Sequence, residues 1–170
     1  MSVVIRTLKE ADYEAVSRIY AEGIATGIAT FETEVLDWPD WNDKYISSCR
    51  LVAIIADKVV GFAVLSKVSN REVYKGVAEV SVYVSNHHKG KGIGEDLLNQ
   101  LIIESENKSF WTLQASIFSE NRASINLHIK CGFKVVGIRE KIGNYTGNGM
   151  IICYWKKELI NQFYNKHINV

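Results

Sequence analysis

The chain has 170 residues, 47% hydrophobic and 23% charged, which is enough for one globular domain over residues 1–170 with its own core. Its net charge of +1 at pH 7 gives no overall attraction to nucleic acid or to an anionic membrane. No apolar run approaches the roughly 18 residues of a spanning helix, and the N-terminus lacks the basic-then-apolar layout of a signal peptide. We therefore expect a cytoplasmic protein without nucleic-acid or membrane partners.

The first half of the chain reads as a strand, two helices and three more strands. An alternating β-branched run predicts a strand at residues 3–9, and apolar residues at helical spacing predict a helix at 10–25. Residues 26–35 read as a loop, and Pro39 in a first turn favours a second helix over 37–49. Three further strands are expected at residues 51–57, 58–68 and 77–85, with a hairpin turn at Asp57-Lys58 and a polar loop at 69–76.

The second half alternates helices with strands. Periodicity predicts a helix at residues 94–108 and a strand at 110–118. A second helix is expected at 119–133, opened by Ser119 and stopped by Gly132. Two closing strands are expected at 134–143 and 148–159. The order β-α-α-β-β-β-α-β-α-β-β predicts an α+β or mixed α/β domain.

Residues 87–96, "HHKGKGIGED", place three glycines and two lysines between a strand and a helix. The first N–H groups of a helix lack intrahelical partners and carry the positive end of its dipole, so they bind phosphate where the backbone can come close. Glycine allows that approach, and Lys89 and Lys91 add charge. A pyrophosphate cradle and a plain glycine-rich turn with solvated lysines both fit. The stretch does not match the Walker A pattern or the Rossmann pattern, which are two other glycine-rich phosphate-binding loops.

Two blocks of the sequence resemble the GNAT N-acetyltransferases. The first is "VSVYVSNHHKGKGIGEDLL", where the family pattern Arg/Gln-x-x-Gly-x-Gly/Ala falls on residues 89–94 with Lys89 in the first position. The second is "SENRASINLHIKCGFKVVG", at the usual separation. The resemblance implies a GNAT fold, with a mixed, mostly antiparallel sheet of about seven strands and about four helices. It also implies acetyl-CoA as acetyl donor.

A narrower resemblance is to the phosphinothricin and methionine sulfoximine acetyltransferases, carried by "GIATFET", "REVY" and "AEVSVYVS". It implies acetylation of the amine of a small amino acid or analogue, by direct attack in a ternary complex. One departure concerns residues 145–151, because the Trp and Asp that the subgroup often carries between its last two strands are missing. The acceptor is therefore less constrained than the donor.

The resemblance also implies roles for individual residues. Glu79 is the expected base for the acceptor ammonium, and His128 is the expected acid for the leaving thiolate. A solvent-facing strand carboxylate and a packed core histidine are the alternatives. The expected cofactor contacts are Val82, Tyr83 and Val84 through their backbone, the loop Lys89, Gly90, Lys91, Gly92, Ile93 and Gly94, and Asn121 and Ser124. For Asn121, helix capping is the competing reading.

Four residues are expected to bind the acceptor. Arg71 would pair with its carboxylate, with Tyr74 close by, and Phe31 and Glu32 would line the same pocket. For Arg71 an exposed loop arginine fits equally well, and Phe31 could belong to the core.

Other functions and features stay open at this point. A peptide N-terminus or an antibiotic amine could be the acceptor, and a CoA-binding sensor without catalysis is a further alternative. Cys49, Cys131 and Cys153 show no metal-ligand spacing, so we expect reduced thiols and no metal. Relatives are often homodimers, so a homodimer is expected. Residues 160–170 read as a C-terminal tail that could pack on its own chain or on a neighbour.

Overall fold

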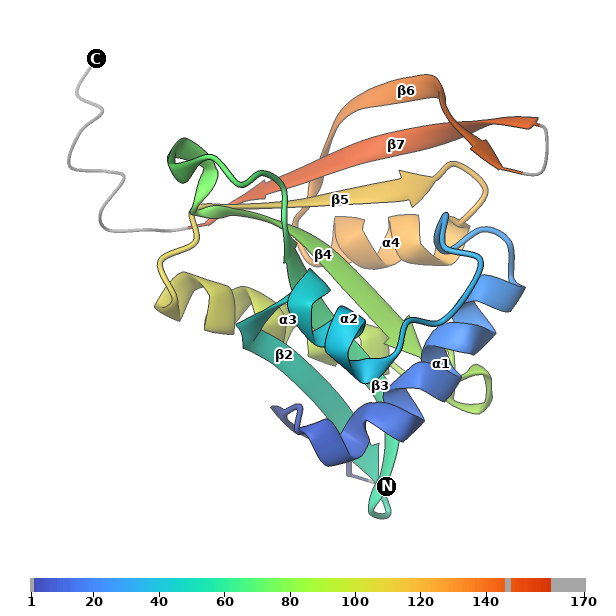
Figure 1. Cartoon of the computed structure of the whole chain (residues 1–170), viewed down its shortest axis with the longest axis vertical. Helices are drawn as coiled ribbons and strands as arrows, with labels where there is room; N and C mark the ends of the chain where they lie inside the picture. The colour runs from blue at the N-terminus through green and yellow to red at the C-terminus, as the bar shows by residue number, and fades with distance from the viewer. Residues whose placement is uncertain (1, 146–147, 160–170) are drawn as a thin grey trace.

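A single seven-stranded sheet organises the computed structural model, which describes residues 2–145 and 148–159 (Figure 1). The strand order is β1-β2-β3-β4-β5-β7-β6. All neighbours pair antiparallel except β4 and β5, which are parallel. The predicted mixed, mostly antiparallel sheet is therefore confirmed. The strands are β1 (Val4–Thr7), β2 (Tyr45–Ile55), β3 (Lys58–Lys67), β4 (Val77–Val84), β5 (Thr112–Phe118), β6 (Lys134–Tyr145) and β7 (Asn148–Glu158).

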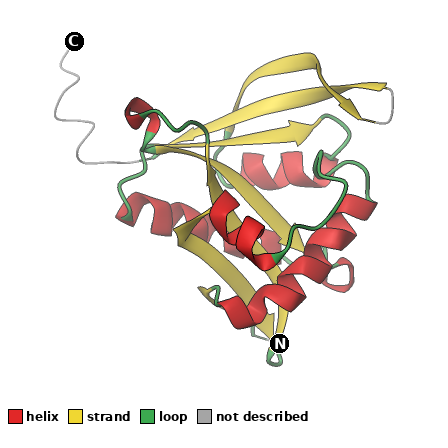
Figure 2. Ribbon diagram, in the orientation of Figure 1, coloured by secondary structure: helices red, strands yellow, loops and turns green. Residues whose placement is uncertain are grey.

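Helices cover both faces of the sheet (Figures 1 and 2). On one face lie α1 (Tyr13–Ala25) and α2 (Trp38–Lys44), and on the other lie α3 (Ile93–Asn107) and α4 (Arg122–Lys130). Three short 3-10 turns complete the described elements: η1 (Glu10–Asp12), η2 (Glu72–Tyr74) and η3 (Asn86–His88). The sheet thus separates two apolar cores.

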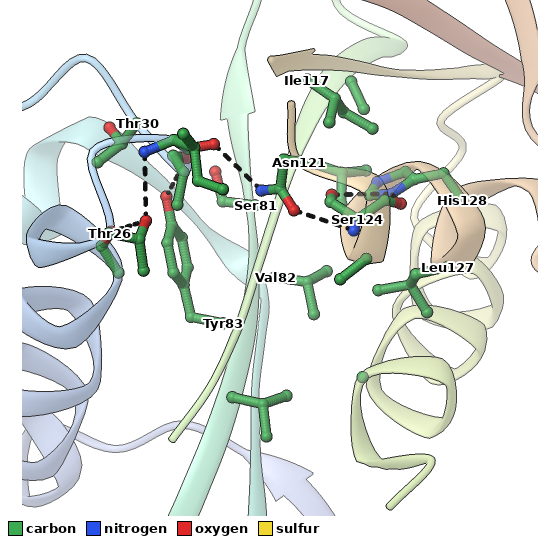
Figure 3. Close-up of a pocket in the computed structure, with 18 of the residues that line it drawn as sticks. Thr26, Thr30, Ser81, Val82, Tyr83, Ile117, Asn121, Ser124, Leu127 and His128 are labelled. Atoms are coloured by element: carbon green, nitrogen blue, oxygen red, sulfur yellow. Dashed lines mark hydrogen bonds between the residues drawn. The ribbon is translucent and has the colours of Figure 1, made fainter. Parts of the chain in front are cut away.

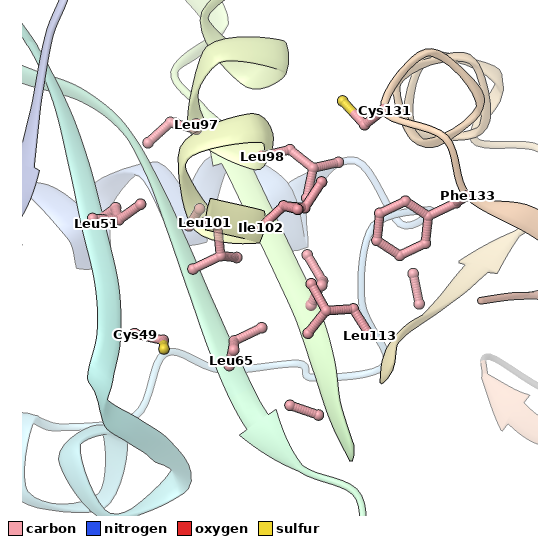
Figure 4. Close-up of a cluster of buried hydrophobic side chains, with 14 of the residues drawn as sticks. Cys49, Leu51, Leu65, Leu97, Leu98, Leu101, Ile102, Leu113, Cys131 and Phe133 are labelled. Carbon is pink, nitrogen blue, oxygen red and sulfur yellow. The ribbon is translucent and has the colours of Figure 1, made fainter. Parts of the chain in front are cut away.

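The larger core lies between the sheet and α3, where Leu97, Leu98 and Leu101 are fully buried (Figure 4). The smaller core lies under α1 and α2 and centres on Trp41 and Phe62. Side chains alternate across a strand, so β4 contributes to both cores. Its Ala78 and Val80 face the larger one, and Tyr83 packs against the smaller one, with its ring stacked on Phe62 at 5.2 Å.

The structure corrects three predicted boundaries. The helix predicted at residues 37–49 ends at Lys44, because Tyr45 already begins β2 and pairs with Ser66 of β3. The last helix begins at Arg122 with Asn121 as its N-cap, and not at Ser119, because the Asn121 side chain accepts the Ser124 N–H at 3.1 Å. The β2–β3 hairpin turns at Ala56-Asp57, one residue earlier than predicted. Both residues have positive φ, 47° and 60°, as a type I′ turn requires.

Membrane-spanning helices and metal-ligand clusters are both absent from residues 2–145 and 148–159. None of the described helices has the length and hydrophobicity needed to cross a bilayer. Within the described part of the chain, no three His, Cys, Asp or Glu side chains gather as a metal-ligand group. The expected tail at 160–170 lies outside the described residues.

Candidate active site

The candidate site lies where β4 and β5 part. These strands pair only from Val77–Glu79 to Thr112–Gln114, and beyond that point their ribbons diverge (Figure 1). A cavity of about 730 Å³ opens between them, lined by both strands, by the start of α3, by α4 and by the α1–α2 loop. This volume falls within the range of ordinary small-molecule sites, about 300–1,000 Å³. The β4 edge over Val80–Val84 therefore faces the cavity.

The glycine loop forms one end of the cavity. Gly90 and Gly92 have φ values of +75° and +82°, which L side chains rarely adopt. Gly92 is the N-cap of α3, so the free N–H groups of the first helical turn lie at the cavity rim. The side chain of Ile93 is buried in the larger core and anchors this end of the helix.

The loop brings most of its predicted residues to the cavity. Those that line it are Lys89, Gly90, Gly92, Ile93 and Gly94. Lys91 is not among the lining residues, because its Nζ turns back and donates to the carbonyl of His87 at 3.0 Å. A backbone cradle at a helix start, with a lysine beside it, has the donor set that a diphosphate requires. These residues fit the diphosphate of coenzyme A.

Gly94 allows two helices to approach each other closely. A Cβ at this position would lie 3.3 Å from Cδ2 of Leu127 on α4 and 3.7 Å from Cγ2 of Val84 on β4. Glycine therefore lets the first turn of α3 pack against α4 and β4. All three residues, Gly94, Leu127 and Val84, line the cavity.

Glu79 lies at the fork itself. It is the last β4 residue paired with β5, opposite Gln114, and it lines the cavity in a half-buried position. Burial raises the pKa of its carboxyl, and a hydrogen bond from Ser116 on β5 partly offsets that rise. A carboxylate held in this way has a pKa closer to the working range of a general base than an exposed glutamate has.

His128 on α4 lines the cavity, near Ser124 and Leu127 of the same helix (Figure 3). Its side chain is buried, with 3% of its surface exposed. Its Nδ1 lies 2.8 Å from the carbonyl oxygen of Ser124, which can only accept, so Nδ1 carries the proton. Burial lowers the pKa of the imidazole, which favours the neutral ring. Nε2 then presents a lone pair, and it is buried without a hydrogen-bond partner among the described residues. To act as the predicted acid, Nε2 must first receive a proton.

Asn121 uses both ends of its side chain. Its Oδ1 caps α4, and its Nδ2 donates to the carbonyl of Ile28 at 3.2 Å (Figure 3). Asn121 is thus the helix-capping residue that the sequence analysis considered as an alternative. Asn121 and Ser124 both line the cavity, as do Val82, Tyr83 and Val84. All the predicted cofactor-binding residues except Lys91 therefore line the same cavity.

The α1–α2 loop closes the other end of the cavity. Phe31 lies edge-on to Phe118 of β5, with ring centroids 4.7 Å apart. Glu32 forms an ion pair with Lys44 of α2 at 2.5 Å. Both predicted residues line the cavity, and the charge of Glu32 is balanced by Lys44.

Arg71 and Tyr74 lie elsewhere. They sit at the exposed turn η2, where the Arg71 guanidinium lies 5.7 Å from the centre of the Tyr74 ring. Neither is among the described residues that line the cavity. The structure therefore does not bring these two predicted acceptor residues to the rest of the site.

Sequence reasoning missed several polar residues of the site. Ser66, Ser81 and Ser116 line the cavity on the same side as Glu79. Ser116 could have been found, because it alternates, like Gln114, with buried apolar residues in "TLQASIF" and so belongs to one polar face of the strand. Lys44 also lines the cavity and carried no signal in the sequence.

Comparison with known proteins identifies the family. The sequence pattern of the Acetyltransferase (GNAT) domain matches residues 5–150. The chain belongs to the GNAT acetyltransferase family. The predicted fold and the predicted N-acetyltransferase class are thereby confirmed.

Two curated relatives and the solved structure of a third protein are similar to this GNAT chain over most of its length. The methionine sulfoximine/methionine sulfone acetyltransferase of Pseudomonas aeruginosa is 28% identical over 94% of this chain and 96% of its own length. The phosphinothricin N-acetyltransferase of Alcaligenes faecalis is 30% identical over 82% of this chain and 74% of its own. A phosphinothricin acetyltransferase of Sinorhizobium meliloti, solved in complex with acetyl-CoA, superimposes with a TM-score of 0.84 at 28% identity and covers 94% of this chain and 89% of that one. That complex agrees with acetyl-CoA as the predicted acetyl donor.

Proposed function

We propose that this GNAT enzyme transfers the acetyl group of acetyl-CoA to the α-amine of a small amino acid or amino-acid analogue. The named relatives that act on methionine sulfoximine, methionine sulfone and phosphinothricin support this acceptor class. The observation that carries the proposal is the position of Glu79: a half-buried carboxylate in the cavity wall, at the fork between β4 and β5.

Proton transfer defines what the side chains must do. An α-ammonium loses two protons as its nitrogen becomes an amide, and the sulfur of the broken thioester gains one. An α-amine is mostly protonated at neutral pH, with a reference pKa of about 8. Glu79, whose pKa is raised by burial, accepts the first proton directly or through water. The lone pair at Nε2 of His128 is suited to take the second proton and pass it to the sulfur.

Acetyl-CoA supplies the acetyl group as a thioester. The loop Lys89–Gly94 and the first turn of α3 would hold its diphosphate, and the free backbone edge of β4 at Val82–Val84 would pair with its pantetheine arm. Acetyl transfer would then occur beside Glu79.

We further propose a cytoplasmic, single-domain protein that acts as a homodimer. The three cysteines, all free thiols, support a reducing compartment. The edge strand β6 exposes Val135, Val136 and Ile138, which supports contact with a second copy of the chain. Sedimentation of the purified protein tests the dimer.

A substrate panel tests the function. The enzyme is given acetyl-CoA with free amino acids, methionine sulfone, methionine sulfoximine, phosphinothricin, a peptide with a free N-terminus and an aminoglycoside, and thiol release is measured. Saturable release with an amino-acid acceptor is expected. Release only with the peptide or the aminoglycoside would reassign the acceptor, and tight binding of coenzyme A without turnover of any amine would indicate a sensor.

A further inference from the structure

Arg50 on β2 is a buried arginine that the proposed function does not use. Only 6% of its surface is exposed, and among the residues that the structure describes no carboxylate forms an ion pair with it. Arginine is almost never buried to this extent unless its charge is paired or fully hydrogen-bonded. The partners of the guanidinium therefore indicate what it holds in place.

The guanidinium binds the C-terminal end of α2. Nη1 donates to Oδ1 of Asn42 at 2.7 Å, and Nη2 donates to the main-chain carbonyl of Asn42 at 2.6 Å and to that of Tyr45. Nε donates to the carbonyl of Ile46 at 3.3 Å, and the ring of Trp41 lies 5.2 Å from the guanidinium carbon. The last carbonyls of a helix have no intrahelical partner. Arg50 thus serves as a C-terminal cap for α2.

The same contacts hold an irregularity in β2. Tyr45 pairs with Ser66 of β3, but the next paired residues are Arg50 and Val64, so β2 has extra residues over this interval. Bulges of this kind bend a strand and redirect its side chains, and they are frequent next to active sites. The Arg50 side chain binds the carbonyls of Tyr45 and Ile46, where the bulge begins. It therefore fixes the junction between α2 and β2.

This junction forms part of the cavity wall. Lys44, the last residue of α2, and Tyr45, the first of β2, both line the cavity, as does Ser66. Nζ of Lys44 lies 5.6 Å from the centre of the Tyr45 ring and 2.5 Å from Oε1 of Glu32 in the α1–α2 loop. Arg50 is not among the described residues that line the cavity. Any effect of Arg50 on a ligand must therefore pass through the junction.

We propose that Arg50 is a positioning residue for the acceptor, because it fixes the α2–β2 junction and thereby the Lys44–Glu32 pair that holds the α1–α2 loop at the cavity. This assignment rests on the proposed function, in which the acceptor binds at the end that the α1–α2 loop closes. The glycine loop, with Gly90 and Gly92, lies at the other end. Arg50 should therefore affect the acceptor and not acetyl-CoA.

Steady-state kinetics with methionine sulfone as acceptor test this role. Arg50→Gln should raise KM for the acceptor about fivefold, within the range for residues that act on a site without touching its ligand, while kcat and KM for acetyl-CoA are unchanged. Arg50→Lys should raise it less, because lysine keeps the charge but carries its donors on a single nitrogen. A residue that only stabilises the fold would change the amount of active enzyme, and so kcat, without changing KM for the acceptor alone.

A milder variant covers the case in which Arg50→Gln does not fold. Asn42→Ala removes one half-buried acceptor of the guanidinium and leaves the arginine in place. It should raise KM for the acceptor in the same selective way, by a smaller factor. A KM for the acceptor that is unchanged in Asn42→Ala and in Arg50→Lys would overturn the assignment.

Lys44→Met tests the route of the effect. Alone it should raise KM for the acceptor, because it breaks the pair with Glu32. Combined with Arg50→Lys it should give little further rise, because changes within one chain of contacts are not additive. Fully additive effects of the two substitutions on KM would overturn the proposed route through Lys44.

Asp12→Asn is the matched control, because Asp12 is a buried residue in a charge-assisted pair with Arg6 at 2.7 Å and is not among the described residues of the cavity lining. It should lower Tm and leave both KM values unchanged. An acceptor KM that rises in Asp12→Asn as much as in Arg50→Lys would show a general effect of lost stability and would overturn the assignment.

Hydrogen–deuterium exchange gives a readout that needs no acceptor. In Arg50→Lys, exchange should be faster in residues 26–36 as well as in 38–46, and in Asp12→Asn exchange in 26–36 should match the wild type. Unchanged exchange in 26–36 in Arg50→Lys would contradict the coupling of Arg50 to the loop. A wild type that acetylates no amino acid would overturn the proposed function instead, and the exchange result would still decide whether Arg50 positions the loop.

Discussion

The side-chain amide of Asn121 joins two segments that lie 93 residues apart, because its Nδ2 donates to the carbonyl of Ile28 at 3.2 Å while its Oδ1 caps α4. One residue thus fastens the α1–α2 loop, which carries Phe31 and Glu32, to the helix that carries His128. The same side chain therefore positions the α1–α2 loop and the start of α4, which both line the cavity.

Capping and tethering by Asn121 can be separated with two variants. Asn121→Ala should lower the free energy of unfolding by about 1 kcal/mol through loss of the cap and should raise KM for the acceptor. Asn121→Ser retains a capping oxygen but is too short to reach Ile28, so its stability should be near that of the wild type while its KM for the acceptor rises. Urea unfolding and steady-state kinetics give both quantities. Equal KM values in Asn121→Ser and the wild type would show that the tether does not organise the loop.

Removal of the Glu79 charge should disable the chemistry. Glu79→Gln should lower kcat about 10²- to 10⁴-fold at pH 7, the usual contribution of a general base, with little change in KM for acetyl-CoA. In the wild type, activity should fall as the pH is lowered through the pKa of Glu79, which burial has raised above that of an exposed glutamate. That acidic limb should be absent from the residual activity of the variant. Full activity of Glu79→Gln at neutral pH would rule out the base role.

The same substitution should stabilise the fold at high pH. Because the pKa of Glu79 is higher in the folded protein than in the unfolded chain, the folded protein binds this proton more tightly. The resulting stabilisation is complete below the unfolded pKa, about 4.3, and is lost as the pH rises through the folded value. Glu79→Gln should therefore raise Tm relative to the wild type at pH 8 and not at pH 4. A lower Tm at pH 8 would indicate that hydrogen bonds such as that from Ser116 outweigh the cost of burying the charge.

His128→Asn isolates the role of Nε2. The amide nitrogen of Asn can replace Nδ1 as donor to the Ser124 carbonyl, while the Nε2 lone pair is lost. If Nε2 moves a proton to sulfur, kcat should fall about 10²-fold with stability largely kept. His87→Asn, an exposed position outside the cavity lining, is the control and should leave kcat unchanged. A kcat near that of the wild type in His128→Asn would leave His128 with a packing role.

Local chemistry explains which parts of the site the sequence could predict. The glycine loop was predictable because its conformation depends only on neighbouring residues. Gly90 and Gly92 adopt positive φ immediately before a helix that begins at Ile93. Glu79 could be placed in a strand, where a carboxylate within an apolar run is unusual, and the resemblance to the family implied its role as the base. Its proximity to Ser116 depends on the parallel pairing of β4 with β5.

The position of Arg71 could not be predicted in this way. It was expected to bind the acceptor because a guanidinium pairs with a carboxylate and because it stands in "REVY". In the structure it lies at the exposed turn η2 and is not among the described residues that line the cavity. The path of the loop between β3 and β4 decides this, and no local pattern in the sequence specifies that path.

Packing on both faces of β4 has one further consequence. Past Glu79 the strand has a hydrogen-bonded neighbour on one side only, β3, yet its even-numbered residues contact one apolar core and Tyr83 contacts the other. The strand is thus packed on both of its faces, while the backbone edge that faces away from β3 has no hydrogen-bonded neighbour. A ligand that binds along that edge pairs with a strand that is already ordered, so the protein loses little conformational entropy on binding.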